Sequence, residues 1–122
     1  MQNKQMTAEE LLAKMKEQTG TEPRPLTLLA KVMPDIVFEH VRSKTYLEEK
    51  TAIPGKYKLL MSLAIAAAMG SPRCTENYAK LARRTGCSDE EIVETLLVAR
   101  LTKGSSVFST SLPALESLYG EK

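Results

Sequence analysis

One stretch of the chain, Leu59–Met69, constrains the fold more than any other, because Ser62 is its only polar residue. The stretch is rich in alanine, which is the best helix former. A helix that crosses a bilayer needs about 17 to 25 apolar residues, and this run has only 11. It therefore predicts a core helix that is buried on several sides. A monomer of 122 residues cannot readily cover such a helix, so we expect a homo-oligomer.

The composition is that of an ordinary globular protein, with 43% hydrophobic and 26% charged residues, and we expect one domain over residues 1–122. The net charge is +2, and aromatic residues make up only 5%, which argues against a nucleic-acid partner. Two cysteines are too few for a disulfide-stapled scaffold, and the polar segment Met1–Glu10 lacks the layout of a signal peptide. These features predict a cytoplasmic protein with no membrane partner.

Capping residues, prolines and glycines divide the chain into helices, and no segment alternates with the period of a strand. Thr7 with Glu10, and Ser88 with Glu91, have the spacing of capping boxes. The sequence therefore predicts an all-α bundle of five to seven helices. The expected helices cover about Ala8–Gln18, Leu26–Met33, Pro34–Glu48, the Leu59–Met69 run, Pro72–Arg84, Ser88–Lys103 (ended by Gly104-Ser105-Ser106) and a last segment, Phe108–Tyr119.

Cys74 is the most informative position for chemistry. With Ser71 as the N-cap and Pro72 as the first helical residue, the thiol occupies the third position of a helix. Free backbone N–H groups and the positive end of the helix dipole stabilise an anion there, and Arg73 adds positive charge. This placement predicts a reactive thiolate.

A packing role for Cys74 is the alternative. Cys74, Tyr78, Leu81 and Ala82 follow i, i+4, i+7, i+8 spacing, which is typical of a core-facing stripe. A cysteine in such a stripe is usually a small hydrophobic residue, and burial disfavours its thiolate. The spacing alone leaves both readings open.

The remaining candidates for chemistry are weak. Cys87 follows Gly86 in a turn, and the helix before it separates it from Cys74 by about 16 to 20 Å, whereas a disulfide needs Cα atoms within ~7 Å. We therefore expect no internal disulfide. His40, the only histidine, lies beside Glu39 and is predicted to be a surface or groove residue. No metal-ligand spacing and no glycine-rich phosphate loop is present, so we expect neither metal nor cofactor.

A family resemblance rests on the Lys56–Ala68 segment, on Cys74, Ala82 and Gly86, and on the continuation Ser88–Ile92. Over about residues 50–105 the chain resembles the carboxymuconolactone decarboxylase family, which includes the alkyl hydroperoxidase D-like antioxidant proteins. The resemblance implies an all-α fold and assembly as a homotrimer or homohexamer.

The resemblance also assigns positions to the redox site of the family. The two cysteines of its CxxC motif fall at Ser71 and Cys74, the histidine of the motif falls at Tyr78, and the glutamate of the proton relay falls at Leu59. Only Cys74 is retained. The candidate site residues are therefore Cys74, Tyr78 and Ser71, which follow i, i+3, i+7 spacing on one helix face.

Three functions fit these residues. The first is a thiol-dependent peroxide or disulfide reductase, in which Cys74 reacts and an outside thiol resolves the product. The second is a non-redox enzyme for a small organic acid, with Tyr78 as the acid and Arg73 or Lys58 as the carboxylate binder. The third is a non-catalytic ligand-binding or assembly protein, in which the same face packs against a neighbouring subunit.

Overall fold

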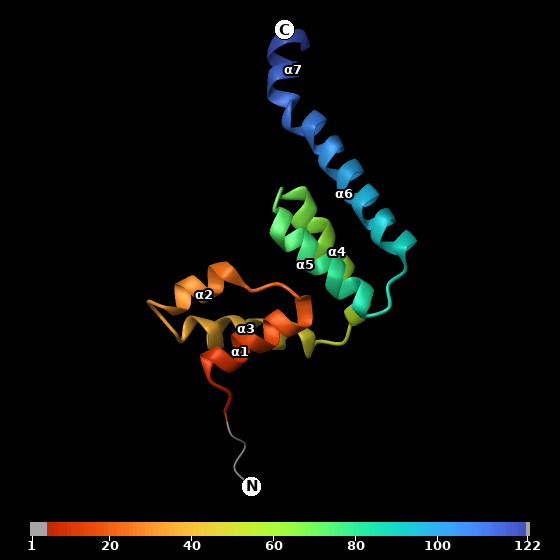
Figure 1. The fold of residues 1–122 in the computed structure, drawn as a ribbon. Coiled ribbons are helices and arrows are strands. Elements are labelled where there is room, and N and C mark those ends of the chain that lie inside the picture. Colours follow the sequence, from red (N-terminus) through yellow and green to blue (C-terminus); the bar gives the residue numbers. More distant parts are fainter. Residues whose placement is uncertain (1–4, 122) are drawn as a thin grey trace. The chain divides into compact units, whose positions relative to one another are not determined.

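The computed structural model describes residues 5–121 and shows seven helices and no strand within that range (Figure 1). The all-α prediction is confirmed. Contacts divide the chain into two compact units that meet at Gly55 and Lys56. The first unit holds α1 (Ala8–Thr19), α2 (Arg24–Ala30) and α3 (Ile36–Glu48), and the second holds α4 (Gly55–Ala68), α5 (Pro72–Arg84), α6 (Asp89–Thr110) and α7 (Leu112–Tyr119).

In the first unit, α1, α2 and α3 contact one another, and Val37 is fully buried. α1 begins as predicted, because the Thr7 hydroxyl accepts a hydrogen bond from the Glu10 N–H at 3.1 Å. α2 begins two residues before the predicted start, since Pro25 fits the first turn of a helix. It ends at Ala30 rather than Met33, because a residue that precedes a proline is disfavoured in the helical conformation.

In the second unit, two long-range interactions hold α4 against α6. The Lys56 ammonium pairs with the Glu91 carboxylate at 2.7 Å, and the Lys103 ammonium donates to the Ala68 carbonyl at 2.6 Å. Both link residues 35 positions apart, so the two helices run in the same direction. α5 contacts α6. The buried residues of this unit are Leu63, Ala66, Ala82, Cys87 and Ala99.

α4 contains the alanine-rich run except its last residue, Met69, which follows the helix, and this chain buries only one side of the run. Leu63 and Ala66 lie in the core, whereas Ile65 is 59% exposed and Met69 is 76% exposed. Four exposed apolar residues follow one another at four-residue spacing and form what we term the α4 stripe: Tyr57, Met61, Ile65 and Met69.

The predicted end of the sixth helix is wrong. α6 continues through Gly104-Ser105-Ser106 to Thr110, because a single glycine costs a helix only about 1 kcal/mol relative to alanine. The Ser106 hydroxyl also donates back to the Lys103 carbonyl at 2.6 Å. The helix ends at Ser111, where Pro113 enters the first turn of α7. The predicted Phe108–Tyr119 segment is therefore divided between α6 and α7.

The serines that precede α5 and α6 cap these helices differently. The Ser88 hydroxyl accepts from the Glu91 N–H at 3.1 Å, and the Glu91 carboxylate accepts from the Ser88 N–H at 2.9 Å. The predicted capping box is confirmed. The Ser71 side chain makes no capping hydrogen bond to α5, so its predicted role as a side-chain cap is wrong.

This difference makes Ser71 a matched control for Ser88. Ser88→Ala should lower the free energy of unfolding by about 1 kcal/mol, because the Glu91 N–H loses its acceptor. Ser71→Ala should change it by less than half as much. Urea unfolding followed by circular dichroism measures both. Equal losses in the two variants would contradict the assigned capping roles.

The ion pair between α4 and α6 predicts a pH dependence. The pKa of Glu91 is lowered chiefly by the hydrogen bond from Lys56 and then by the Ser88 N–H, and the same bond raises the pKa of Lys56. A lowered carboxyl pKa stabilises the fold at neutral pH, and this stabilisation is lost as the pH falls through the folded-state value. Lys56→Met should therefore lower the melting temperature at pH 7, and the difference should shrink in acid. A constant difference from pH 7 to pH 3 would contradict this.

Candidate functional site

Cys74 is the third residue of α5, whose bounds Pro72–Arg84 agree with the prediction. Gly70, at φ 74°, ends the preceding segment in the left-handed region that favours glycine. Pro72 then occupies the first helical position, where its fixed φ is suitable and no N–H is needed. The thiol is free and exposed. The start of α5 therefore presents Cys74 to solvent in the turn where backbone N–H groups favour an anion.

Ser71 and Thr75 fix the first turn around this thiol. The Ser71 carbonyl accepts from both the Thr75 N–H, at 3.0 Å, and the Thr75 hydroxyl, at 2.7 Å. Ser71 thus supports α5 through its backbone and leaves its hydroxyl unused as a cap.

Tyr78 lies one turn beyond Cys74 on the same side of α5, and it is half-buried. Farther along this stripe Leu81 is half-buried and Ala82 is fully buried. The predicted core stripe is thus exposed at its start and buried at its end. Cys74 is not a core residue of this chain.

Asn77 is a polar residue of α5 that the sequence analysis did not select. Its side-chain oxygen Oδ1 is buried, and no donor among the described residues reaches it. An unpaired buried acceptor costs about 1 to 3 kcal/mol, so this atom is an unfavourable feature of α5 in the isolated chain. The sequence could have indicated Asn77, because asparagine has a poor helix propensity and this one lies inside a predicted helix, three residues after Cys74.

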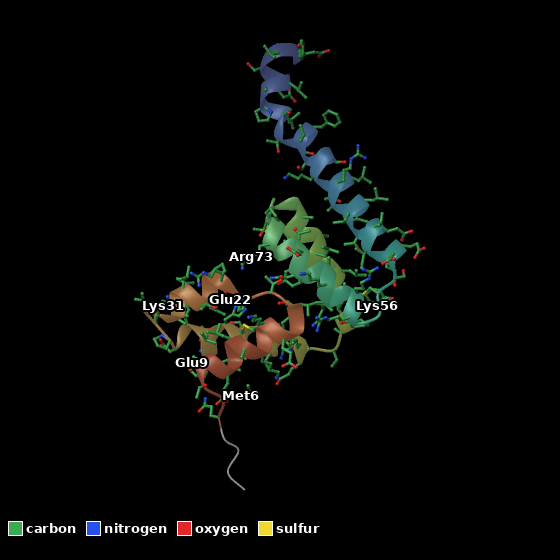
Figure 2. The ribbon with its side chains drawn as sticks, viewed as in Figure 1. Met6, Glu9, Glu22, Lys31, Lys56 and Arg73 are labelled. Carbon is green, nitrogen blue, oxygen red and sulfur yellow. The ribbon has the colours of Figure 1, made fainter. Side chains whose placement is uncertain are left out.

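Of the two predicted carboxylate binders, Arg73 is the one near Cys74. Arg73 is exposed in the first turn of α5 (Figure 2). Lys58 lies in the first turn of α4. It is about 15 Å along the helix axis from the C-terminal end of α4, which is the end that leads into α5. Leu59, at the position of the glutamate in the family relay, is half-buried and supplies no ionisable group.

Cys87 is a buried turn residue, 5% exposed, as its position after Gly86 indicates. Its N–H donates to the Ala82 carbonyl at 3.0 Å. This hydrogen bond holds Cys87 beside Ala82, and Ala82 lies about 12 Å from Cys74 along α5. That separation is well beyond the ~7 Å that a disulfide between Cys74 and Cys87 would allow. Both cysteines are free.

A further candidate site lies within the first unit. A hollow of about 900 Å³ is lined by residues of the first unit, including Phe38, Val41 and Tyr46 from α3, and does not contain Cys74. His40 is exposed, as predicted. In residues 5–121 no cluster of histidine, cysteine and acidic side chains could hold a metal ion, and no helix there is long and apolar enough to span a membrane.

The fold and the position of Cys74 together define a class: small all-helical proteins with a cysteine in the first turn of the helix that follows an alanine-rich helix. The chain belongs to the carboxymuconolactone decarboxylase family, whose model matches residues 37–117. The match runs from α3 into α7 and confirms the resemblance noted over residues 50–105. No curated protein matches the chain significantly.

The exposures of the two cysteines predict their relative reactivity. A thiol-specific alkylating reagent should label Cys74 at least tenfold faster than Cys87, because only Cys74 is exposed and in the first turn of a helix. Cys87→Ser and Cys74→Ser each isolate one thiol, and mass spectrometry follows the rate. Equal rates, or faster labelling at Cys87, would contradict this assignment.

Proposed function

We propose that this protein is a one-cysteine, thiol-dependent reductase of peroxides or disulfides. The observation that supports the proposal is the exposed Cys74 thiol in the N-terminal turn of α5. The resemblance to the family supports it too, because it aligns Cys74 with the second cysteine of the family's CxxC motif. The chain keeps one of the two positions of the motif as cysteine, since Ser71 occupies the other.

The proposed cycle begins with attack of the Cys74 Sγ on the terminal oxygen of a hydroperoxide. The O–O bond breaks, the alcohol leaves with a proton, and Cys74 becomes a sulfenic acid. A thiol from solution then forms a mixed disulfide and releases water. A second thiol attacks this disulfide, restores Cys74 and leaves as the oxidised disulfide. The net reaction consumes one hydroperoxide and two thiols and yields an alcohol, a disulfide and water.

Within this proposal Tyr78 is the proton donor to the leaving alkoxide. It is the ionisable residue one turn from Cys74 on the same side of α5. A phenol is a poorer general acid at neutral pH than the histidine that the family has at this position. The proposal therefore includes slow turnover.

Assembly as a homotrimer or homohexamer is part of the same proposal. The α4 stripe supports it, because a row of four exposed apolar residues on one helix is typical of a surface that another subunit covers. The alanines beside the stripe allow a second helix to approach α4 closely.

The activity test compares wild type, Ser71→Cys and Cys74→Ser in hydroperoxide reduction with an added dithiol. Wild type should turn over slowly and only with the thiol. Ser71→Cys should turn over faster, since it restores the CxxC spacing and allows an internal disulfide. Cys74→Ser should be inactive, and Cys87→Ala, which changes a cysteine outside α5, should behave as wild type.

The product identifies the chemistry. Peroxide without thiol should give a Cys74 sulfenic acid that a dimedone probe traps in wild type but not in Cys74→Ser. Absence of this adduct would refute the redox proposal and favour a non-redox or ligand-binding function. An internal Cys74–Cys87 disulfide in oxidised wild type would refute the one-cysteine cycle.

A further inference from the structure

The hollow of the first unit runs along one face of α3, and its volume is about 900 Å³. Five lining residues of α3 and its caps have i, i+4, i+7, i+11 and i+14 spacing, which places them on one helix face: Asp35, Glu39, Arg42, Tyr46 and Glu49. Apolar side chains also line it: Met6, Leu11, Met33, Ile36, Phe38 and Val41. Asp35 is the N-cap of α3 and Glu49 is its C-cap. The hollow therefore follows the whole of α3, over about 21 Å.

The charges of this hollow are unbalanced, and the excess lies at its two ends. In the middle, Glu39 and Arg42 form an ion pair. Among the described residues Asp35 and Glu49 form no ion pair, and the Asp35 side chain makes no capping hydrogen bond. Three carboxylates and one guanidinium line the hollow, so its net charge is −2. Each end thus offers one carboxylate to a cation.

The width of the hollow limits what can occupy it. Its volume divided by its length gives a mean cross-section of about 43 Å². A helix with its side chains is about 10 to 12 Å in diameter and needs at least about 80 Å². An extended peptide is narrower, but its N–H and C=O groups need hydrogen-bond partners, and the uncharged polar residues of the lining are only Gln5 and Thr45. A linear ligand without a peptide backbone fits these walls better.

We propose that this hollow binds an elongated organic dication, with an apolar body and a cationic group at each end. Asp35 and Glu49 each accept from one cationic group, and the apolar walls cover the body. With charge-assisted hydrogen bonds of about 2.8 Å at both ends, the two cationic groups are about 15 Å apart. A ligand with further charges in its middle is disfavoured, because those charges would leave water and meet Arg42.

The Glu49 end of the hollow already holds one ammonium group. The Lys50 ammonium lies 4.4 Å from the centroid of the Tyr46 ring. An aromatic face and the C-terminal carbonyls of a helix both favour a cation. Phe38 adds a second aromatic ring to the lining. These features support a cationic ligand over a neutral one.

The proposal goes beyond the thiol chemistry of Cys74. Part of the hollow lies outside the region that matches the family, because Met6, Leu11, Met33 and Asp35 precede residue 37. Cys74 does not line it. Failure of either proposal therefore leaves the other standing.

Dodecanediamine is the probe, because its two nitrogens are about 16 Å apart in an extended chain, at roughly 1.2 Å per bond. Isothermal titration calorimetry on the full chain should show one site. Hexanediamine is too short to reach both carboxylates and should bind at least tenfold more weakly. Spermine has the same chain length but two further ammonium groups in its middle, and it should also bind more weakly. Attraction by charge alone would instead favour spermine.

Three variants locate the bound diamine. Asp35→Asn and Glu49→Gln should each weaken the binding of dodecanediamine about fivefold, because one exposed charge pair is lost. Glu48→Gln removes the neighbouring carboxylate, which does not line this hollow, and should leave the binding unchanged. Circular dichroism checks that the helices remain.

Arg42→Gln tests the middle of the hollow. It should narrow the preference for dodecanediamine over spermine, since the inner ammonium groups of spermine no longer meet a cation and Glu39 becomes available to them. Spermine that binds wild type as tightly as dodecanediamine would overturn the proposal. Equal losses in Glu48→Gln and Glu49→Gln would place the diamine elsewhere and also overturn it. Wild type that binds no dodecanediamine would leave the hollow to a covering protein surface.

Discussion

The small core of the second unit is the constraint on which the rest of this structure depends. Its buried residues are chiefly alanines, and Leu63 is the one large side chain that is fully buried among residues 56–121. Burial of apolar surface contributes about 25 cal/mol per Å², and small side chains bring little surface with them. Helices that meet through alanines approach closely but gain little stability from each contact. A chain of this kind benefits from every additional apolar face that it can cover.

Polar contacts orient the helices around this core. The Lys56–Glu91 pair and the Lys103–Ala68 hydrogen bond join α4 to α6 at two levels, and Glu91 also completes the capping box with Ser88. One carboxylate thus fixes both the start of α6 and its register against α4. Cys87, which is buried, immediately precedes Ser88 and so lies next to this junction. Cys74 lies in the first turn of α5 and is exposed, whereas Cys87 lies in the turn that follows α5 and is buried.

Local signals in the sequence predicted most of the helices, because caps, prolines and glycines act within a few residues. Ser88 with Glu91, Pro72 and Gly86 placed the bounds of α5 and the start of α6 correctly. Gly104 misled the prediction, since helix continuation depends on the surrounding residues and not on one glycine. The spacing of Cys74 and Ala82 could not show that one is exposed and the other buried, because burial depends on where α6 lies. The partner of Lys56 and the unpaired oxygen of Asn77 are also consequences of tertiary packing.

The proposed assembly and the proposed thiol chemistry would place opposite demands on the second unit. The proposed resolution of a Cys74 sulfenic acid by an outside thiol requires open space at Cys74, whereas the proposed assembly would cover the α4 stripe. The α4 stripe ends at Met69, two residues before Ser71, so a subunit packed there would lie close to the first turn of α5. Such a neighbour would restrict which thiols and peroxides reach Cys74, and the assembly would thereby set the selectivity of a site that its own residues leave open.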